Sequence, residues 1–129
     1  MFERTILIAD KSRKSRQQLA ELFQDSHYTV ETTGSAAYLI YRVLQHQQPI
    51  ILLGNRFEEK IEVSDLIALL KACNRSLNII LVSDEDSLLS LRKARQEGIF
   101  YHSLKPISHA DNEELRSVVE CAFSRLQPI

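Results

Sequence analysis

Polar side chains follow four of the short apolar runs in this chain. Three of these runs consist mainly of Ile, Leu and Val, and all four are followed by charged, amide or hydroxyl groups. Together these side chains supply carboxylates, ammonium groups, an amide and a hydroxyl, which pair with charged ligands or hydrogen-bond to polar ones. The residues are Asp10, Lys11, Asn55, Ser83, Asp84 and Lys105. They form a candidate binding site if the fold brings the ends of the runs together.

Five apolar runs predict five β-strands. They lie at residues 5–9, 28–32, 50–53, 78–82 and 99–102. The first, third and fourth runs are nearly continuous, which is typical of strands covered on both faces, whereas the second alternates and suits a sheet edge. Between and after the runs, apolar residues recur with the i, i+3, i+4 spacing of a buried helical stripe, so we also expect five helices.

This alternation predicts an α/β fold in a single domain, residues 1–129. We expect a doubly wound, flavodoxin-like parallel sheet of five strands with the order 2-1-3-4-5. In such sheets ligands bind beyond the carboxyl ends of the strands, where the strand order reverses. That point lies between the first and third strands, next to Asp10, Lys11 and Asn55.

Composition excludes several classes of protein. The net charge is −1, which does not favour a nucleic-acid binder. There are three glycines, too dispersed for a phosphate-binding loop, so a flavodoxin-like enzyme or small-ligand binder is disfavoured. The two cysteines are 48 residues apart, so they form neither a zinc-ligand pair nor a disulfide framework. No apolar run reaches the length of a membrane span. We expect a cytoplasmic domain with no membrane or nucleic-acid partner.

The strand ends resemble the receiver domain of two-component response regulators along almost the whole chain. The run that ends in Asp10 is similar to the family's first strand and its acidic pair. Asn55 stands at the phosphoacceptor position, Ser83 at the switch hydroxyl, and Lys105-Pro106-Ile107 at the Lys-Pro-aromatic motif. The resemblance implies phosphoryl transfer to an Asp with the help of Mg²⁺, and it suggests a cis peptide before Pro106.

Three departures point to a degenerate pseudo-receiver. Asn55 cannot form an acyl phosphate, Lys11 replaces the second acid, and Asp84 replaces a small residue beside the switch hydroxyl. Asp10 alone should bind Mg²⁺ weakly or not at all. We therefore expect no enzymatic activity, no cofactor, and the ammonium group of Lys11, Lys105 or both as the counter-charge to Asp10. An alternative is an active phosphorelay receiver with Asp10 or Asp84 as an unusual acceptor.

Function would then rest on contacts with a protein partner or a second copy. The resemblance implies a surface formed by the fourth helix, the fifth strand and the fifth helix. Phe123 and Cys121 fall off the main stripe of the fifth helix, so they either contribute an exposed apolar patch there or take part in secondary packing. The resemblance also implies that a switch residue on the fifth strand is coupled to the hydroxyl at Ser83, and His102 stands at this switch-like position. The plainer interpretation is that His102 is only a partly exposed edge residue. The basic run formed by Lys11, Arg13, Lys14 and Arg16 is interpreted as a solvated face, with an anion or partner-phosphate site at the start of the helix as the alternative.

Overall fold

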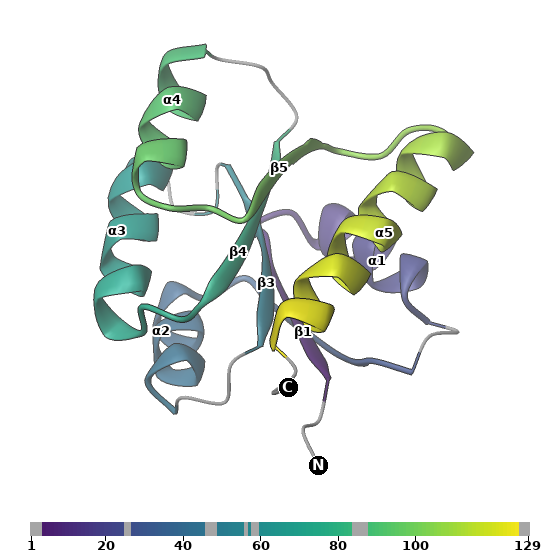
Figure 1. Cartoon of the computed structure of the whole chain (residues 1–129), viewed down its shortest axis with the longest axis horizontal. Coiled ribbons are helices and arrows are strands. Elements are labelled where there is room, and N and C mark those ends of the chain that lie inside the picture. Colours follow the sequence, from purple (N-terminus) through teal and green to yellow (C-terminus); the bar gives the residue numbers. More distant parts are fainter. Residues whose placement is uncertain are drawn as a thin grey trace.

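A computed structural model describes residues 4–24, 27–45, 49–55, 57, 60–83 and 88–126, and five strands alternate with five helices along this part of the chain (Figure 1). The strands are β1 (Thr5–Ala9), β2 (Thr29–Thr33), β3 (Ile50–Gly54), β4 (Asn78–Ser83) and β5 (Tyr101–Leu104). The helices are α1 (Arg13–Leu22), α2 (Ala36–Leu44), α3 (Val63–Cys73), α4 (Leu88–Gln96) and α5 (His109–Leu126).

The strands form one parallel sheet with the order β2-β1-β3-β4-β5, which confirms the predicted topology. β1, β3 and β4 are the inner strands, and β2 and β5 form the two edges. The near-continuous apolar runs predict this arrangement because an inner strand of a two-sided sheet has no polar face. Every residue of β1 and β3 is buried.

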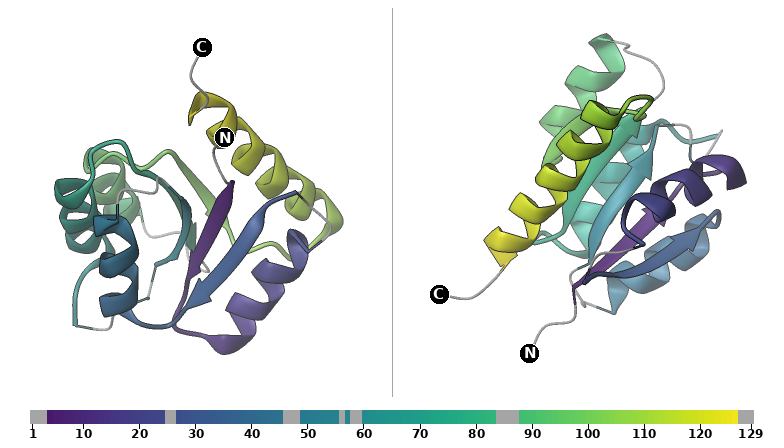
Figure 2. Two further views of the ribbon diagram at one scale, coloured as in Figure 1. Left: turned by 90° about the horizontal axis from the view of Figure 1, so that it is seen from below. Right: turned by 90° about the vertical axis from the view of Figure 1, so that its right-hand side faces the viewer.

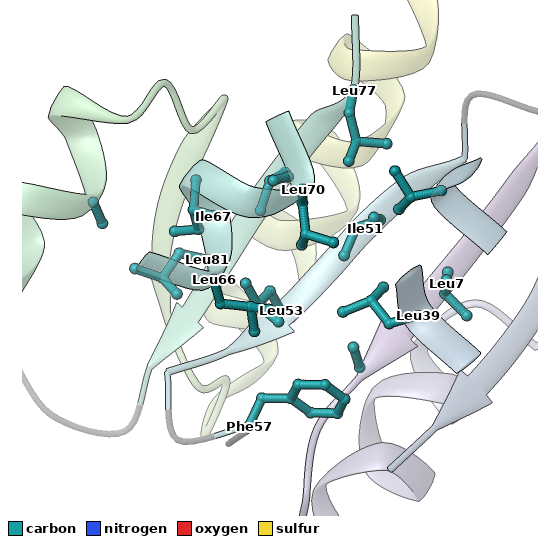
Figure 3. Packing of buried hydrophobic residues seen from close by; sticks show 14 residues of the cluster. Leu7, Leu39, Ile51, Leu53, Phe57, Leu66, Ile67, Leu70, Leu77 and Leu81 are labelled. Atoms are coloured by element: carbon teal, nitrogen blue, oxygen red, sulfur yellow. The ribbon is translucent and has the colours of Figure 1, made fainter. Parts of the chain in front are cut away.

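Helices cover both faces of the sheet, as the two views of Figure 2 show. One core lies beneath α2, α3 and α4, and Figure 3 shows Leu39, Leu66 and Leu70 of these helices packed on Ile51 and Leu53 of β3. The other core lies beneath α1 and α5. Because successive strand residues point to opposite faces, each inner strand contributes to both cores.

Local signals fix the ends of several helices. The hydroxyls of Ser12 and Ser35 accept hydrogen bonds from the backbone N–H groups of Ser15 and Tyr38, so they are the N-caps of α1 and α2. Gly98 adopts a φ of 95° in the turn after α4, a conformation that favours glycine. Within the described residues, no helix is both long and apolar enough to cross a bilayer.

In the C-terminal part, the structure corrects the bounds of one predicted strand and decides between two alternatives for α5. The fifth strand runs from Tyr101 to Leu104 rather than over residues 99–102. Phe100 instead lies just before it, and its N–H donates to the carbonyl of Ile79. Phe123 is only 4% exposed, because its ring stacks on Tyr28, with ring centroids 4.8 Å apart. Phe123 therefore takes part in secondary packing rather than in an exposed patch, whereas Cys121 is exposed.

Candidate functional site

The register of the strands brings the predicted site residues to one edge of the sheet. Ala9 pairs with Leu53, so the next residues, Asp10 and Gly54, are neighbours across β1 and β3. The same alignment continues through β4 and β5. The residues that follow or end these strands, in spatial order, are Asp10, Asn55, Ser83 and Lys105. Lys11 follows Asp10 in the loop before α1. Asp84 lies outside the described residues.

Asp10 is the buried acid of this edge, with 6% of its surface exposed. Its Oδ1 atom accepts a hydrogen bond of 2.9 Å from the N–H of Ser12, and Oδ2 lies 3.6 Å from the Nζ atom of Lys105. Within the described residues, Oδ2 has no hydrogen-bond partner. The described contacts that hold the Asp10 carboxylate include a backbone donor and an ammonium group.

Gly54 permits this placement of Asp10. A Cβ atom added to Gly54 would lie 2.7 Å from Oδ2 of Asp10 and 2.9 Å from its Cγ atom. Distances this short are not tolerated between unbonded heavy atoms, so a side chain at position 54 would displace the carboxylate. The absence of a Cβ at the end of β3 thus provides the space that Asp10 occupies.

Lys105 joins three elements at the site. Its Nζ atom donates a hydrogen bond of 3.0 Å to Oγ of Ser15 in α1, in addition to the ion pair with Asp10. Its backbone N–H donates to the carbonyl of Ser83, at 2.8 Å, at the end of β4. The peptide bond to Pro106 is trans, in contrast to the cis bond suggested by the family resemblance.

Ser83 and His102 are linked directly across β4 and β5. Oγ of Ser83, which is 3% exposed, lies 2.7 Å from Nε2 of the half-buried His102. The plainer interpretation of His102 as an edge residue is therefore incomplete, because its ring forms a specific hydrogen bond. Tyr101, its neighbour, is 36% exposed, and its hydroxyl donates a hydrogen bond to Glu114.

Arg16 supports the site from α1 and was missed at the level of sequence. Its Nη1 atom donates to the backbone carbonyls of Asp10, at 2.7 Å, and Lys11, at 3.1 Å. The same atom would lie 2.6 Å from a Cβ atom on Gly34. The solvated interpretation is thus wrong for Arg16, because the side chain folds back over the start of its own helix. The side chain of Lys11 is exposed.

A second polar cluster, also missed from sequence, lies at the β2 edge of the sheet. Glu31 accepts hydrogen bonds from the hydroxyl of Tyr38, at 2.9 Å, and from the guanidinium of Arg42. The hydrogen bond to Glu31, followed by desolvation, raises the pKa of Tyr38 above its ordinary value of 10.0. Because Glu31 and Arg42 lie in different elements, their ion pair joins α2 to the edge strand.

Comparison with known proteins adds sequence and fold relationships. No protein-family model matches the chain. The chain is 33% identical over 128 residues to the DNA-binding transcriptional regulator NtrC of Azospirillum brasilense. The match covers 99% of this chain and 26% of NtrC, so the chain spans about a quarter of the length of that relative.

Solved structures share the fold at low sequence identity. A two-component response regulator from Clostridium difficile superposes with a TM-score of 0.83 at 16% identity, covering 98% of this chain and 100% of that one. This is the receiver fold. The signal receiver domain of an HD domain-containing protein from Pseudomonas fluorescens has a TM-score of 0.82 at 21% identity, over 95% of this chain and 96% of that one. The beryllofluoride-activated NtrC4 receiver domain dimer has a TM-score of 0.82 at 17% identity, over 95% and 98% of the chains.

The site of this receiver fold is poor in metal ligands. No group of three or more His, Cys, Asp or Glu side chains is positioned to hold a metal ion within the part of the chain that the structure describes. Among the described residues, the ammonium group of Lys105 lies beside Asp10. Asn55, at the end of β3, is half-buried and offers an amide. The arrangement can hold a fixed network of hydrogen bonds and charges, but it contains no carboxylate at position 55.

Proposed function

We propose that this chain is a receiver domain of the two-component response-regulator type that does not accept a phosphoryl group. It acts as a protein-interaction module and not as an enzyme. The observation that carries the proposal is Asn55 at the end of β3, next to the edge that holds Asp10, Ser83 and Lys105. The similarity to NtrC and the receiver fold support the assignment of the chain as a receiver domain.

The chemistry of Asn55 supports loss of phosphoryl transfer. An aspartate attacks phosphorus with an anionic oxygen and forms a mixed anhydride. The oxygen of a neutral carboxamide carries no full negative charge, so its nucleophilicity is far lower. Asn55 keeps the size and hydrogen-bonding ability of the side chain, which explains how the site retains its shape without this reactivity.

The charges around Asp10 support weak or absent binding of Mg²⁺. Magnesium binds through oxygen ligands, usually with one or two carboxylates. The counter-charge of Asp10 is Lys105, at 3.6 Å, and the following residue is Lys11. A divalent cation would have to displace or approach these positive charges. We therefore propose that the ammonium group of Lys105 takes the place of a metal ion, with Lys11 adding to the repulsion.

Treatment with acetyl phosphate and, separately, with beryllofluoride tests this function in the presence of Mg²⁺. We expect no phosphorylated species by intact mass spectrometry and no beryllofluoride-dependent amide shifts. The matched positive control is the double variant Lys11→Asp with Asn55→Asp, which restores both acids. Phosphorylation of the unmodified chain, followed by mapping to Asp10 or Asp84, would instead establish the alternative of an active receiver with an unusual acceptor.

A further inference from the structure

We propose that two copies of this chain associate through the outer side of α2 and α3, with the helices of the two copies antiparallel. The two helices contact each other and cover the same core (Figure 1). Each has an exposed stripe with the spacing i, i+4, i+7. The α2–α3 face consists of Ala37, Tyr41 and Leu44 of α2 with Asp65, Leu69 and Ala72 of α3. The inference rests on the proposed function, a protein-interaction module, and names a second copy as the partner.

The outer side of α2 is as apolar as its inner side. Leu39 is buried in the core, whereas Tyr41 and Leu44 expose 57% and 53% of their surfaces to solvent. Arg42, the one charged residue in the sequence of this helix, is buried and pairs with Glu31. A helix that is apolar on all sides is normally buried on all sides. The exposed stripe of α2 therefore fits a contact with another uncharged, apolar surface.

Two tyrosine rings are held in place on this side of α2. The hydroxyl of Tyr38 donates a hydrogen bond of 2.9 Å to Glu31, and its ring lies next to that of Tyr41, with centroids 6.3 Å apart. Tyrosine is enriched among the residues that dominate binding energy at interfaces. Because these rings are already arranged, association costs less side-chain entropy than it would for mobile side chains.

The charges of α3 favour a second copy in the antiparallel orientation. Asp65 lies in the first turn of α3, and Arg75 is exposed in the turn after the helix ends. Among the described residues, neither forms an ion pair. Leu69 lies four residues after Asp65 and six before Arg75. When two copies of α3 cross antiparallel at Leu69, Asp65 of each copy faces Arg75 of the other, and the two-fold axis repeats this pair. A parallel arrangement would instead bring like charges together.

The size of the α2–α3 face predicts a weak association. The helices have 9 and 11 residues, so they are about 14 and 17 Å long, and two of them side by side are about 20 Å across. Their outline covers about 300 Å² per copy, whereas a standard stable complex buries about 800 Å² per partner. The dimer should therefore be transient and become populated where copies are concentrated or tethered together.

Sedimentation of the purified chain over a range of concentrations, up to about 1 mM, tests the proposal. We expect a monomer–dimer equilibrium, with concentration-dependent amide shifts confined to residues 36–44 and 65–75. Leu44→Gln should weaken the dimer by about tenfold or more, because two leucines leave a two-fold contact. The matched control is Leu104→Gln, since Leu104 is also 53% exposed but lies in β5. It should leave the dimer unchanged.

Reversal of the two charges tests the orientation. Asp65→Arg should weaken the dimer, because each new arginine faces Arg75 of the other copy. The double variant Asp65→Arg with Arg75→Asp exchanges the charges and should restore the association. A substitution that only disturbs the fold would not be rescued in this way. The amide spectrum of each variant reports whether it is folded.

Four results would overturn the proposal. These are a monomer at every concentration, equal effects of Leu44→Gln and Leu104→Gln, no rescue by the charge exchange, and concentration-dependent shifts on α4, β5 and α5 instead of α2 and α3. The measurements use no phosphoryl donor or metal ion. Their failure is therefore distinguishable from failure of the proposed function, which the acetyl phosphate experiment measures separately.

Discussion

The Nζ atom of Lys105 lies 3.6 Å from Oδ2 of Asp10, and these two residues come from opposite ends of the chain. The lysine also contacts Ser15, so one side chain joins the β5–α5 connection to β1 and α1. The Asp10 side chain is 8% exposed and that of Lys105 28% exposed, which places the pair in a partly desolvated environment. Loss of either charge should therefore affect stability.

Replacement of Lys105 by Met should destabilise the fold by about 1–3 kcal/mol, because the buried carboxylate of Asp10 loses its counter-charge. Urea unfolding measures the change. The double variant Lys105→Met with Asp10→Asn removes both charges and should recover part of the loss. A Lys105→Met variant as stable as the wild type would show that the ion pair contributes nothing.

Replacement of Gly54 by Ala should also destabilise the fold, by about 1–3 kcal/mol, since the new methyl group overlaps the Asp10 carboxyl group. Gly34→Ala is a matched control. Its Cβ would meet the end of the long Arg16 side chain, which can move more easily. We expect a smaller loss for Gly34→Ala by urea unfolding, and the opposite order would contradict the placement of Asp10 against Gly54.

Arg16→Gln should lower the free energy of unfolding by about 1–2 kcal/mol, because two backbone carbonyls lose a charged donor. It should also speed hydrogen exchange in the loop between β1 and α1. Arg13→Gln, at an exposed position of the same helix, is expected to change stability by less than about 0.5 kcal/mol. Equal effects of the two substitutions would mean that Arg16 is only a solvated charge.

The hydrogen bonds of two tyrosines predict a loss of stability at alkaline pH. Hydrogen bonds to Glu31 and Glu114 raise the pKa values of Tyr38 and Tyr101, respectively, above 10.0 in the folded state. The folded chain thus favours the neutral phenol. The neutral phenols contribute fully to the free energy of unfolding below pH 10. This contribution declines as the pH rises through the folded-state pKa. Urea unfolding at a series of pH values above neutrality should show this decline.

Glu31→Gln separates the two tyrosines. The substitution removes both the charged acceptor and its repulsion of a phenolate, so the pKa of Tyr38 should fall towards 10.0. The pKa of Tyr101 should not respond, because its partner is Glu114. Carbon-13 shifts of the tyrosine rings against pH give both values. An unchanged Tyr38 pKa would show that Glu31 does not control it.

The sequence predicts the sheet well because its inner strands have a simple signal. Runs of Ile, Leu and Val require burial on both faces, and the alternating pattern of β2 marks an edge. β5 lacks such a signal. Its four residues include exposed Tyr101 and Leu104, whereas the more apolar Ile99 and Phe100 precede it. The strand is thus defined by pairing with β4, which local composition does not encode.

The site follows the same distinction between local and distant information. Strand ends locate Asp10, Asn55, Ser83 and Lys105, because parallel strands end at one edge. The charges at these ends also predict the pairing of Asp10 with Lys105, and the family resemblance relates Ser83 to His102. The role of Arg16 is not predicted, because the residue belongs to a basic run and looks solvated. Likewise, the burial of Phe123 depends on Tyr28, far away in the chain.

The open edge at β2 has a consequence for how copies of this chain meet in concentrated solution. An uncovered strand offers unpaired backbone groups, on which another molecule can extend the sheet and begin an aggregate. Glu31 places a charge in the middle of that strand, and Arg42 and Tyr38 hold it in position. We therefore expect the charge of Glu31 to disfavour such strand addition, and an apolar residue in its place to favour aggregation.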